Sequence, residues 1–393
     1  MPIFKRADIL LPKTDIEKWA VIACDQHTAN PEYWQNAEKK REGSPSSLDL
    51  IIPEVYLSDD YEKRVVSASD NMKKYLENDI FELHKDSMIY VERETLSGVR
   101  KGLVGIIDLN EYDYNKGSSA KIRATEMTVT ERIPPRVKVR RDALLELPHI
   151  LVLVDDKDFE VIEPCSREKD SYKKAYSASL MLSGGHIDGY FLSESAMDRV
   201  ESTLDRLSQR SGFALAIGDG NHSLAAAKEC VSKDHPESRF ALCEIVNIHE
   251  ASLVFEPIYR VVFGVDGEKL LSDMEKYFGT LSSESGQKAL AVYNGAQKEL
   301  SLPPVKSLTV ATLTEFLDAY TKENEKVTID YIHGKEEALR LAEGKNTVAF
   351  LFDVIGKSEL FKAVEKDGAL ARKTFSMGEA SDKRYYLEAR KIK

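Results

Sequence analysis

Residues 213–228 read FALAIGDGNHSLAAAK, and this stretch decides the fold. The apolar run Phe213–Ile217 has the length of a buried strand, a tight polar loop follows from Gly218 to His222, and an alanine-rich helix starts near Ser223. A strand, a short loop and a helix in direct succession are typical of folds in which helices flank a sheet. The sequence therefore predicts a mixed α/β protein built on a central sheet.

The loop of this stretch combines residue types that bind anions. Gly218 and Gly220, on either side of Asp219, let the backbone turn sharply and approach a ligand closely. The helix that follows presents its first N–H groups and the positive end of its dipole, where phosphate groups bind. We therefore expect Gly218, Gly220, Asn221 and Ser223 to contact a phosphate group.

Two side chains of the loop could take part in catalysis. Asp219 supplies a carboxylate that could bind Mg²⁺ or accept a proton from a hydroxyl group, and His222 could donate to a phosphate oxygen. A purely structural reading is as well supported by composition, because a glycine pair before a helix is a weak motif. In that reading the glycines only make a turn and Asn221 only caps the helix.

Working outward from the loop, the hydrophobic pattern predicts the other elements. We expect helices at 61–83, with a break, and at 166–182, and a further helix from Ser193 or Ser195 to Gly212. Strands are expected at 19–24, 88–93, 101–109, 136–140, 150–154, 187–192, 239–248 and 253–263, the last two in the sheet of the strands before them. After Gly264 the sequence alternates between helix and strand patterns and contains more Lys and Glu. This change predicts a main mixed-sheet domain at 1–264 and a smaller C-terminal α/β domain at 265–393.

Length, composition and charge exclude several classes of protein. A chain of 393 residues with 42% hydrophobic and 31% charged residues is globular and long enough for two domains. The formal net charge of −11 argues against a protein that coats nucleic acid. The cysteines form no Cys-x-x-Cys pair, and no apolar run approaches the roughly 20 residues that cross a bilayer. We therefore expect a cytoplasmic protein with reduced thiols and no membrane partner.

Further candidate site residues lie outside the central loop. Asp25, Gln26 and His27 follow an apolar segment, where we expect Asp25 to be catalytic and the other two to bind substrate, although a strand end is polar in any case. Cations for a phosphate could come from Arg123 and Arg136, whose alternative is internal salt bridges. The other candidates for substrate binding are Glu126 and Arg260; in its apolar strand Arg260 must meet an acid, a ligand or solvent.

The loop resembles the Gly-x-His-Arg-x-x-Ala element of the ParB and sulfiredoxin-like superfamily, which includes nucleotide-binding proteins and free-serine kinases. Gly220, His222 and Ala226 stand at matching positions, whereas Ser223 stands where the element carries arginine. The resemblance implies a ParB/sulfiredoxin-like central sheet and a nucleotide ligand, ATP or ADP. The cation that replaces the arginine would have to come from elsewhere, and the family resemblance suggests that Lys373 and Arg384, with residues 376–379, could close over the site.

The whole chain resembles the domain of unknown function 1015 family, in its subgroup with Asn-His-Ser in the loop. The stretches that carry the resemblance are 21–34, 122–140, 218–228, 255–262 and 375–388. Membership implies a cytoplasmic microbial protein, with an association with serine metabolism.

These observations combine into one leading hypothesis. It is a Mg²⁺-dependent phosphotransferase that acts on a small hydroxylated metabolite, with serine or phosphoserine favoured and a nucleotide as the phosphate partner. Phosphoserine phosphatase activity at the same site is one alternative, and a non-catalytic switch that binds a nucleotide or metabolite is another. The oligomeric state stays open.

Overall fold

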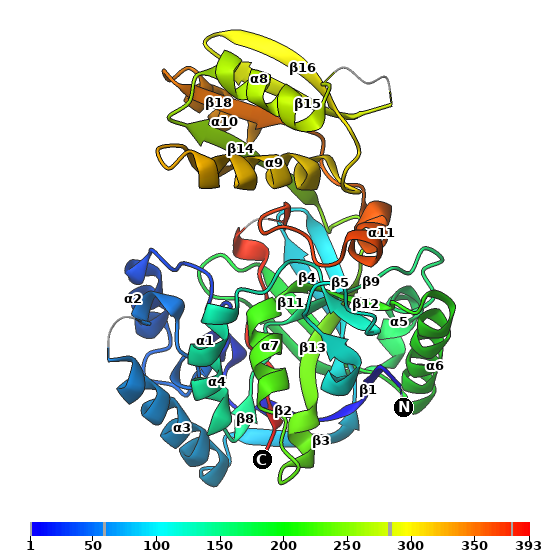
Figure 1. Ribbon diagram of the computed structural model, residues 1–393. Coiled ribbons are helices and arrows are strands. Elements are labelled where there is room, and N and C mark those ends of the chain that lie inside the picture. The colour runs from blue at the N-terminus through cyan, green and yellow to red at the C-terminus, as the bar shows by residue number, and fades with distance from the viewer. Residues whose placement is uncertain (1, 58–59, 282–284, 379) are drawn as a thin grey trace. The chain divides into compact units, whose positions relative to one another are not determined.

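The computed structural model describes residues 2–57, 60–281, 285–378 and 380–393 (Figure 1). The chain forms two compact units. The first unit comprises Met1–Ala124, Thr128–Leu253 and Gly378–Lys393, and the second comprises Thr125–Met127 and Val254–Met377. This division differs from the expected ranges 1–264 and 265–393, because the strand after Val254 belongs to the second unit and the last residues of the chain return to the first.

The first unit contains most of the chain's strands and seven of its labelled α-helices. Its strands are β1 (Phe4–Lys5), β2 (Ala7–Pro12), β3 (Phe81–Ser87), β4 (Ile89–Thr95), β5 (Gly98–Asp108), β6 (Tyr112–Asp113), β7 (Ile122–Ala124), β8 (Leu145–Glu146), β9 (Leu151–Val154), β10 (Lys173–Ser179), β11 (His186–Phe191), β12 (Leu215–Asp219), β13 (Phe240–Asn247) and β20 (Arg390–Lys391). Its helices are α1 (Ile16–Trp19), α2 (Pro31–Lys40), α3 (Tyr61–Glu77), α4 (Ile133–Arg141), α5 (Glu163–Glu168), α6 (Glu194–Ser211) and α7 (Asn221–Glu229).

A large mixed sheet organises the first unit. Its strand order is β10-β11-β4-β5-β13-β9-β12-β7-β6, and β1 pairs with β5. Strand β12 runs parallel to β7 and antiparallel to β9, and β13 runs parallel to β9. The mixed α/β fold expected from the sequence is thus confirmed.

Both faces of this sheet are covered, because successive residues of each strand enter different cores. In β4, Ile89 and Val91 belong to a core with Trp19, Trp34 and the C-terminal segment, whereas Tyr90 belongs to a core with helices α5, α6 and α7. In Figure 1, α4 and α7 lie beside each other, in agreement with their packing contacts. The candidate turn between β12 and α7 is therefore anchored by a strand that is buried within the sheet.

The second unit is built around a smaller antiparallel sheet of order β16-β15-β18-β14-β17, with β19 paired to β14. Its strands are β14 (Phe255–Phe263), β15 (Gln287–Tyr293), β16 (Ala296–Leu302), β17 (Thr328–His333), β18 (Thr347–Leu351) and β19 (Phe375–Met377), and its helices are α8 (Gly267–Phe278), α9 (Thr309–Glu323), α10 (Lys335–Ala342) and α11 (Lys357–Asp367). The expectation that 253–263 shares the sheet of 239–248 is wrong, since β14 and β13 lie in separate sheets.

Three local predictions also need correction. Residues 136–140 lie in helix α4 and not in a strand, because Pro134 and Pro135 stand at the start of that helix, where proline is well tolerated. The expected helix 166–182 is wrong: α5 ends at Glu168, and residues 173–179 form strand β10, in which Tyr176 and Ala178 are buried on one face. The expected strand 19–24 is the end of α1 followed by a single bridge at Ile22. No helix among the described residues is both long and apolar enough to span a membrane.

Candidate functional site

The turn between β12 and α7 is shorter than the expected loop of residues 218–222, because residues 218–219 end β12, residues 221–222 begin α7 and Gly220 alone lies between them. Gly220 precedes α7 with a φ of 84°, a left-handed conformation that favours glycine. A Cβ atom there would lie 3.0 Å from Cγ1 of Ile150, so the position is also sterically tight. The N–H of Gly220 donates to Oδ1 of Asp219 at 2.9 Å. The carboxylate of Asp219 is therefore fixed at the end of a buried strand, beside the N-terminus of α7.

Two distant segments pair with each other beside this loop. Ile22 forms an isolated antiparallel bridge with Tyr385, and the N–H of Ala23 donates to the carbonyl of Arg384 at 2.9 Å. This pairing places Asp25, near the N-terminus, and Lys383, near the C-terminus, next to Asp219. The proximity of these three residues is a property of the tertiary structure alone.

Lys383 bridges the two carboxylates. Its Nζ lies 2.8 Å from Oδ2 of Asp25 and 3.3 Å from Oδ1 and from Oδ2 of Asp219. Each of the three side chains is about a quarter exposed, at 26%, 24% and 25% for Lys383, Asp25 and Asp219. The group is thus shielded yet reachable by a ligand. We call Asp25, Asp219 and Lys383 the dyad–lysine cluster.

The two carboxylates of this cluster differ in acidity. Burial opposes the ionisation of Asp25, yet the charge of Lys383 and other nearby cations lowers its pKa overall. The pKa of Asp219 is raised, first because the group is buried and further because of the negative charge of Asp25. Both carboxylates raise the pKa of Lys383. Asp25 is therefore the permanent anion, and Asp219 is the better proton acceptor.

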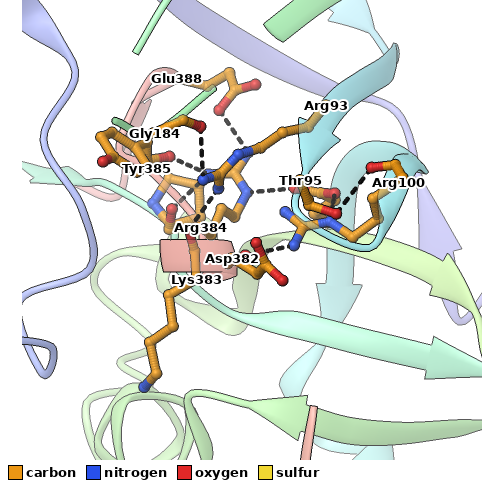
Figure 2. Close-up of polar contacts among 12 residues, drawn as sticks. Arg93, Thr95, Arg100, Gly184, Asp382, Lys383, Arg384, Tyr385 and Glu388 are labelled. Carbon is orange, nitrogen blue, oxygen red and sulfur yellow. Dashed lines mark hydrogen bonds and ion pairs between the residues drawn. The ribbon is translucent and has the colours of Figure 1, made fainter. Parts of the chain in front are cut away.

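A set of buried arginines holds the segment that carries Lys383 (Figure 2). Arg93 donates to the carbonyls of Ser381 at 2.7 Å and of Lys383, and Arg100 donates to the carbonyl of Asp382 at 2.6 Å. Arg384 is sealed in the core, where it pairs with Glu244 at 2.9 Å and Glu388 at 2.6 Å. In Figure 2 the side chain of Lys383 extends away from these arginines. The network thus fixes the backbone of residues 381–384 while leaving the ammonium group for the cluster.

A hydrogen-bonded chain of neutral groups lies beside the cluster. The N–H of Cys24 donates to the hydroxyl of Tyr386 at 3.2 Å, and this hydroxyl lies 2.8 Å from Nδ1 of His149. Nε2 of His149 lies 3.2 Å from Oγ of Ser223. Burial lowers the pKa of His149 despite the nearby carboxylates, so the ring is neutral at neutral pH. We call His149, Ser223 and Tyr386 the neutral relay.

The neutral relay opens on a cavity of about 150 Å³ inside the first unit. Most of the cavity wall is apolar. The residues that line it are Cys24, Leu50, Ile51, Ile52, Glu54, Leu57, Tyr61, Met72, Pro135, Arg136, Val139, Arg140, Ala143, Leu145, Glu146, Leu147, His149, Ser223, Ala226 and Tyr386. The three residues of the cluster do not line this cavity, but His149 does, and the charges of Asp25 and Asp219 act on it, so the cavity lies near the cluster.

Of the other residues predicted in the loops, His222, Gln26 and His27 make contacts within the first unit. Nε2 of His222 accepts the N–H of Val129 at 3.1 Å. Asn221 has a buried Oδ1 with no hydrogen-bond partner. Gln26 is held by a backbone turn to Ala23. His27 stacks on Tyr33, with ring centres 3.8 Å apart.

Of the two predicted cations, Arg136 is near enough for its charge to lower the pKa of Asp25, whereas Arg123 lies elsewhere. Arg123 lies over the ring of Phe213, at the end of β12 opposite to Asp219. Arg136 forms an ion pair with Glu54 in the cavity wall. The cation that contacts both Asp25 and Asp219 is instead Lys383, which the sequence analysis did not name.

Glu126 and Arg260 belong to the second unit. Oε1 of Glu126 accepts the N–H of Thr374 at 3.3 Å. Arg260 donates to the carbonyl of Ile258 at 2.6 Å and lies 4.7 Å from the centre of the Tyr331 ring. Burial lowers its pKa to about 10. The guanidinium is thus held by a carbonyl, a weak hydroxyl contact with Thr314 and an aromatic ring, and the charges of Glu126 and Asp318 partly offset the effect of burial on its pKa.

The donor atoms near Asp219 offer a limited fit to Mg²⁺. Across the described ranges, no three His, Cys, Asp or Glu side chains come together as a metal-binding group. Both oxygens of Asp219 already contact Lys383, whereas Oδ1 of Asp25 is buried without a hydrogen-bond partner. Mg²⁺ in nucleotide sites is usually bound by one or two carboxylates together with phosphates and water. Asp25 therefore fits a Mg²⁺ ion carried by a nucleotide better than Asp219 does.

Sequence reasoning missed three residues of the site, namely Lys383, His149 and Tyr386. The stretch 375–388 was recognised as part of the family resemblance and contains Lys383 and Tyr386, but nothing in it indicated which side chain reaches the loop. The pairing of Ile22 with Tyr385 joins segments more than 350 residues apart, and no local pattern encodes such a contact.

Comparison with solved structures gives remote similarities. A conserved hypothetical protein from Pyrococcus furiosus is 13% identical with a TM-score of 0.37 and coverage of 72% of this chain and 90% of that chain. SbnI with a C-terminal truncation, from Staphylococcus aureus, is 10% identical with a TM-score of 0.38 and coverage of 70% and 82%. A free serine kinase in complex with AMP is 14% identical with a TM-score of 0.40 and coverage of 73% and 90%. Similarity at this level says nothing about the activity of this chain.

Comparison with known sequences is more specific. No curated protein matches the chain. A family model described as a protein of unknown function, DUF1015, matches residues 5–321, which is most of the chain. The chain therefore belongs to the DUF1015 family.

Proposed function

We propose that this protein is a phosphotransferase that moves the terminal phosphoryl group of a nucleotide to the hydroxyl group of a small metabolite. The observation that carries the proposal is the dyad–lysine cluster beside the N-terminus of α7. Phosphoryl transfer depends mainly on positioning and on charge neutralisation, and the cluster offers a cation, a proton acceptor and a helix N-terminus at one place.

Each group of the cluster has a distinct role in the proposed reaction. The acceptor oxygen forms a bond to the terminal phosphorus, the bond from that phosphorus to the bridging oxygen breaks, and the nucleoside diphosphate leaves. Asp219 takes the proton of the acceptor hydroxyl, in keeping with its raised pKa. The ammonium of Lys383 stabilises the oxygens of the group in transfer, and the ionised Asp25 holds that ammonium in place.

The charge balance of the cluster suits a nucleotide bound together with Mg²⁺. Two carboxylates and one ammonium leave a negative charge, which would repel a bare phosphate group. Oδ1 of Asp25 would hold the ion, and Mg²⁺ when bound would supply charge neutralisation for the phosphates. The ion is part of this proposal as a companion of ATP or ADP. Serine is the first acceptor to test, and phosphoserine is the matching product.

The experiment is a mass-spectrometric assay of the full chain with MgATP and a panel of small hydroxylated compounds that includes serine. We expect ADP and a phosphorylated compound in equal amounts. Lys383→Met should abolish this product, whereas Lys391→Met, an exposed change in the same C-terminal segment, should not. Release of inorganic phosphate from phosphoserine without transfer would favour the phosphatase, and nucleotide binding without turnover would favour the switch. Either result would contradict the proposal.

A further inference from the structure

The cavity beside the dyad–lysine cluster has a chemical character that constrains its occupant. Its wall is formed mainly by aliphatic side chains from three parts of the first unit: the 50–57 segment, helices α3 and α4, and residues 143–147. Met72 and Ala226 both line the cavity and are both buried. An apolar wall binds an apolar group because contact with it removes hydrocarbon surface from water.

The charged side chains in the described lining already have partners within the protein. Arg136 pairs with Glu54, and Arg140 pairs with Glu146 at 2.6 Å. Glu146 also pairs with Arg390 at 2.6 Å. An amino acid zwitterion placed in the cavity would have to give up water around its ammonium and carboxylate groups without gaining an ion pair, which is unfavourable.

The remaining polar side chains of the lining are uncharged. They are Cys24, Tyr61, whose hydroxyl donates to the carbonyl of Pro135, and the neutral relay, in which Nε2 of His149 and Oγ of Ser223 are 3.2 Å apart. Hydroxyl and neutral imidazole groups both donate and accept hydrogen bonds, so they can form hydrogen bonds with the hydroxyl group of an alcohol. The relay end of the cavity is the part near the dyad–lysine cluster, because the charges of Asp25 and Asp219 act on His149.

The size of the cavity also sets a limit. A cavity of about 150 Å³ has the volume of the engineered apolar cavity in another protein, of roughly 150 Å³, that binds benzene. It therefore accommodates an apolar group of about six carbon atoms.

We infer that the cavity binds the uncharged, apolar part of a hydroxylated ligand, with its hydroxyl group at the neutral relay. This inference rests on the proposed function for the reaction and refines its acceptor: the acceptor is an alcohol with a hydrocarbon portion of up to about six carbons, and not free serine. The hydroxyl at the relay end would face Asp219, while the hydrocarbon portion fills the cavity.

The inference is tested by measuring how unbranched primary alcohols, from ethanol to hexanol, bind to the full chain in the absence of nucleotide. Protein chemical shifts should give dissociation constants that fall by about fourfold per methylene group until the cavity is full. Serine should cause no shifts at the cavity residues at the same concentrations. Equal affinity for all the alcohols, no binding of any of them, or binding of serine in the cavity would overturn the inference.

Two variants change the size of the cavity in opposite directions. In the parent protein, affinity should stop increasing at a certain alcohol chain length. Ala226→Leu should reduce this limiting chain length, and Met72→Ala should increase it. Val66→Ala, on the same helix as Met72 but 60% exposed, is the matched control and should leave the series unchanged. An unchanged chain-length limit in both folded cavity variants would also overturn the inference. If a variant does not fold, the series on the unaltered protein decides.

The outcomes for the cavity and for the reaction are separable. Transfer from MgATP to serine, with no preference for longer alcohols, would leave the proposed function standing and overturn the cavity inference. Chain-length-dependent alcohol binding that responds to the two cavity variants, without transfer to any compound, would support the cavity inference and refute the phosphotransferase.

Discussion

Replacement of Lys383 by methionine isolates the contribution of its ammonium group. Methionine keeps an unbranched apolar side chain but leaves Asp25 and Asp219 without the cation that lies 2.8 Å and 3.3 Å from them. Removal of one partner of a buried ion pair typically costs about 3–5 kcal/mol. Because these side chains are about a quarter exposed, solvent reduces the loss, and we expect about 2–3 kcal/mol of unfolding free energy at pH 8.

The loss should depend on pH in a defined direction. In the parent, Lys383 lowers the pKa of Asp25, so this carboxylate stabilises the fold above its unfolded pKa of about 3.9, and that contribution is lost as the pH falls through the lower folded value. Without the ammonium the pKa of each carboxylate rises, and the folded variant takes up a proton that the parent does not bind. A difference of one proton changes stability by about 1.4 kcal/mol per pH unit. The variant should therefore lose more unfolding free energy, relative to the parent, at pH 8 than at pH 5.

Urea unfolding of the parent, Lys383→Met and Lys391→Met at pH 5 and pH 8 measures this effect. We expect Lys391→Met to follow the parent at both values, because its side chain is exposed. The transfer assay on the same samples reports the catalytic role. If Lys383→Met loses the same unfolding free energy at the two pH values, or loses more at pH 5, the electrostatic argument is refuted. If the variant retains turnover, Lys383 has no part in the mechanism.

Three further changes test separate parts of the site. Asp219→Asn should abolish turnover in the transfer assay while changing the unfolding free energy by no more than about 1–2 kcal/mol, and parental activity would exclude Asp219 as the proton acceptor. Arg93→Met leaves the buried carbonyls of Ser381 and Lys383 without their donor, so urea unfolding should show a loss of about 1–3 kcal/mol; parental stability would mean that water replaces the guanidinium. Burial lowers the pKa of His149, so its unfolded form binds protons more readily and stability falls as the pH drops below about 6.5; His149→Gln should show a smaller loss between pH 7 and pH 5.5, and an identical loss would assign the effect to other groups.

Local patterns in the sequence were reliable where one short-range signal dominated. Ser193 caps α6 through a bond to the N–H of Ala196, and Gly212 ends that helix with a φ of 68°, both as expected from residue type. Local patterns failed where the same residues were compatible with two kinds of secondary structure. Alternating cations and valines at 136–140 suggested a strand, yet the prolines before them begin α4.

The central loop was predictable for the same local reason. Two glycines around Asp219 can make a sharp turn from a buried strand into a helix without help from the rest of the chain, and the structure has this turn with Gly220 in the left-handed region. The role of the neighbouring His222 was not predictable in detail, because its Nε2 accepts a hydrogen bond from Val129, more than 90 residues away.

The amino-acid sequence by itself determined the α/β class, the position of the strand–loop–helix element and the candidates Asp25 and Asp219, because periodicity, turn chemistry and charge act over a few neighbouring residues. Only the tertiary structure decided that Lys383 is the cation of the site, that His149 and Tyr386 form a relay with Ser223, and that an apolar cavity adjoins them. The physical reason is that ion pairs and cavities depend on distances in space, and here the segments around residues 25, 149, 219 and 383 meet through strand pairing and buried arginines whose partners are hundreds of residues apart.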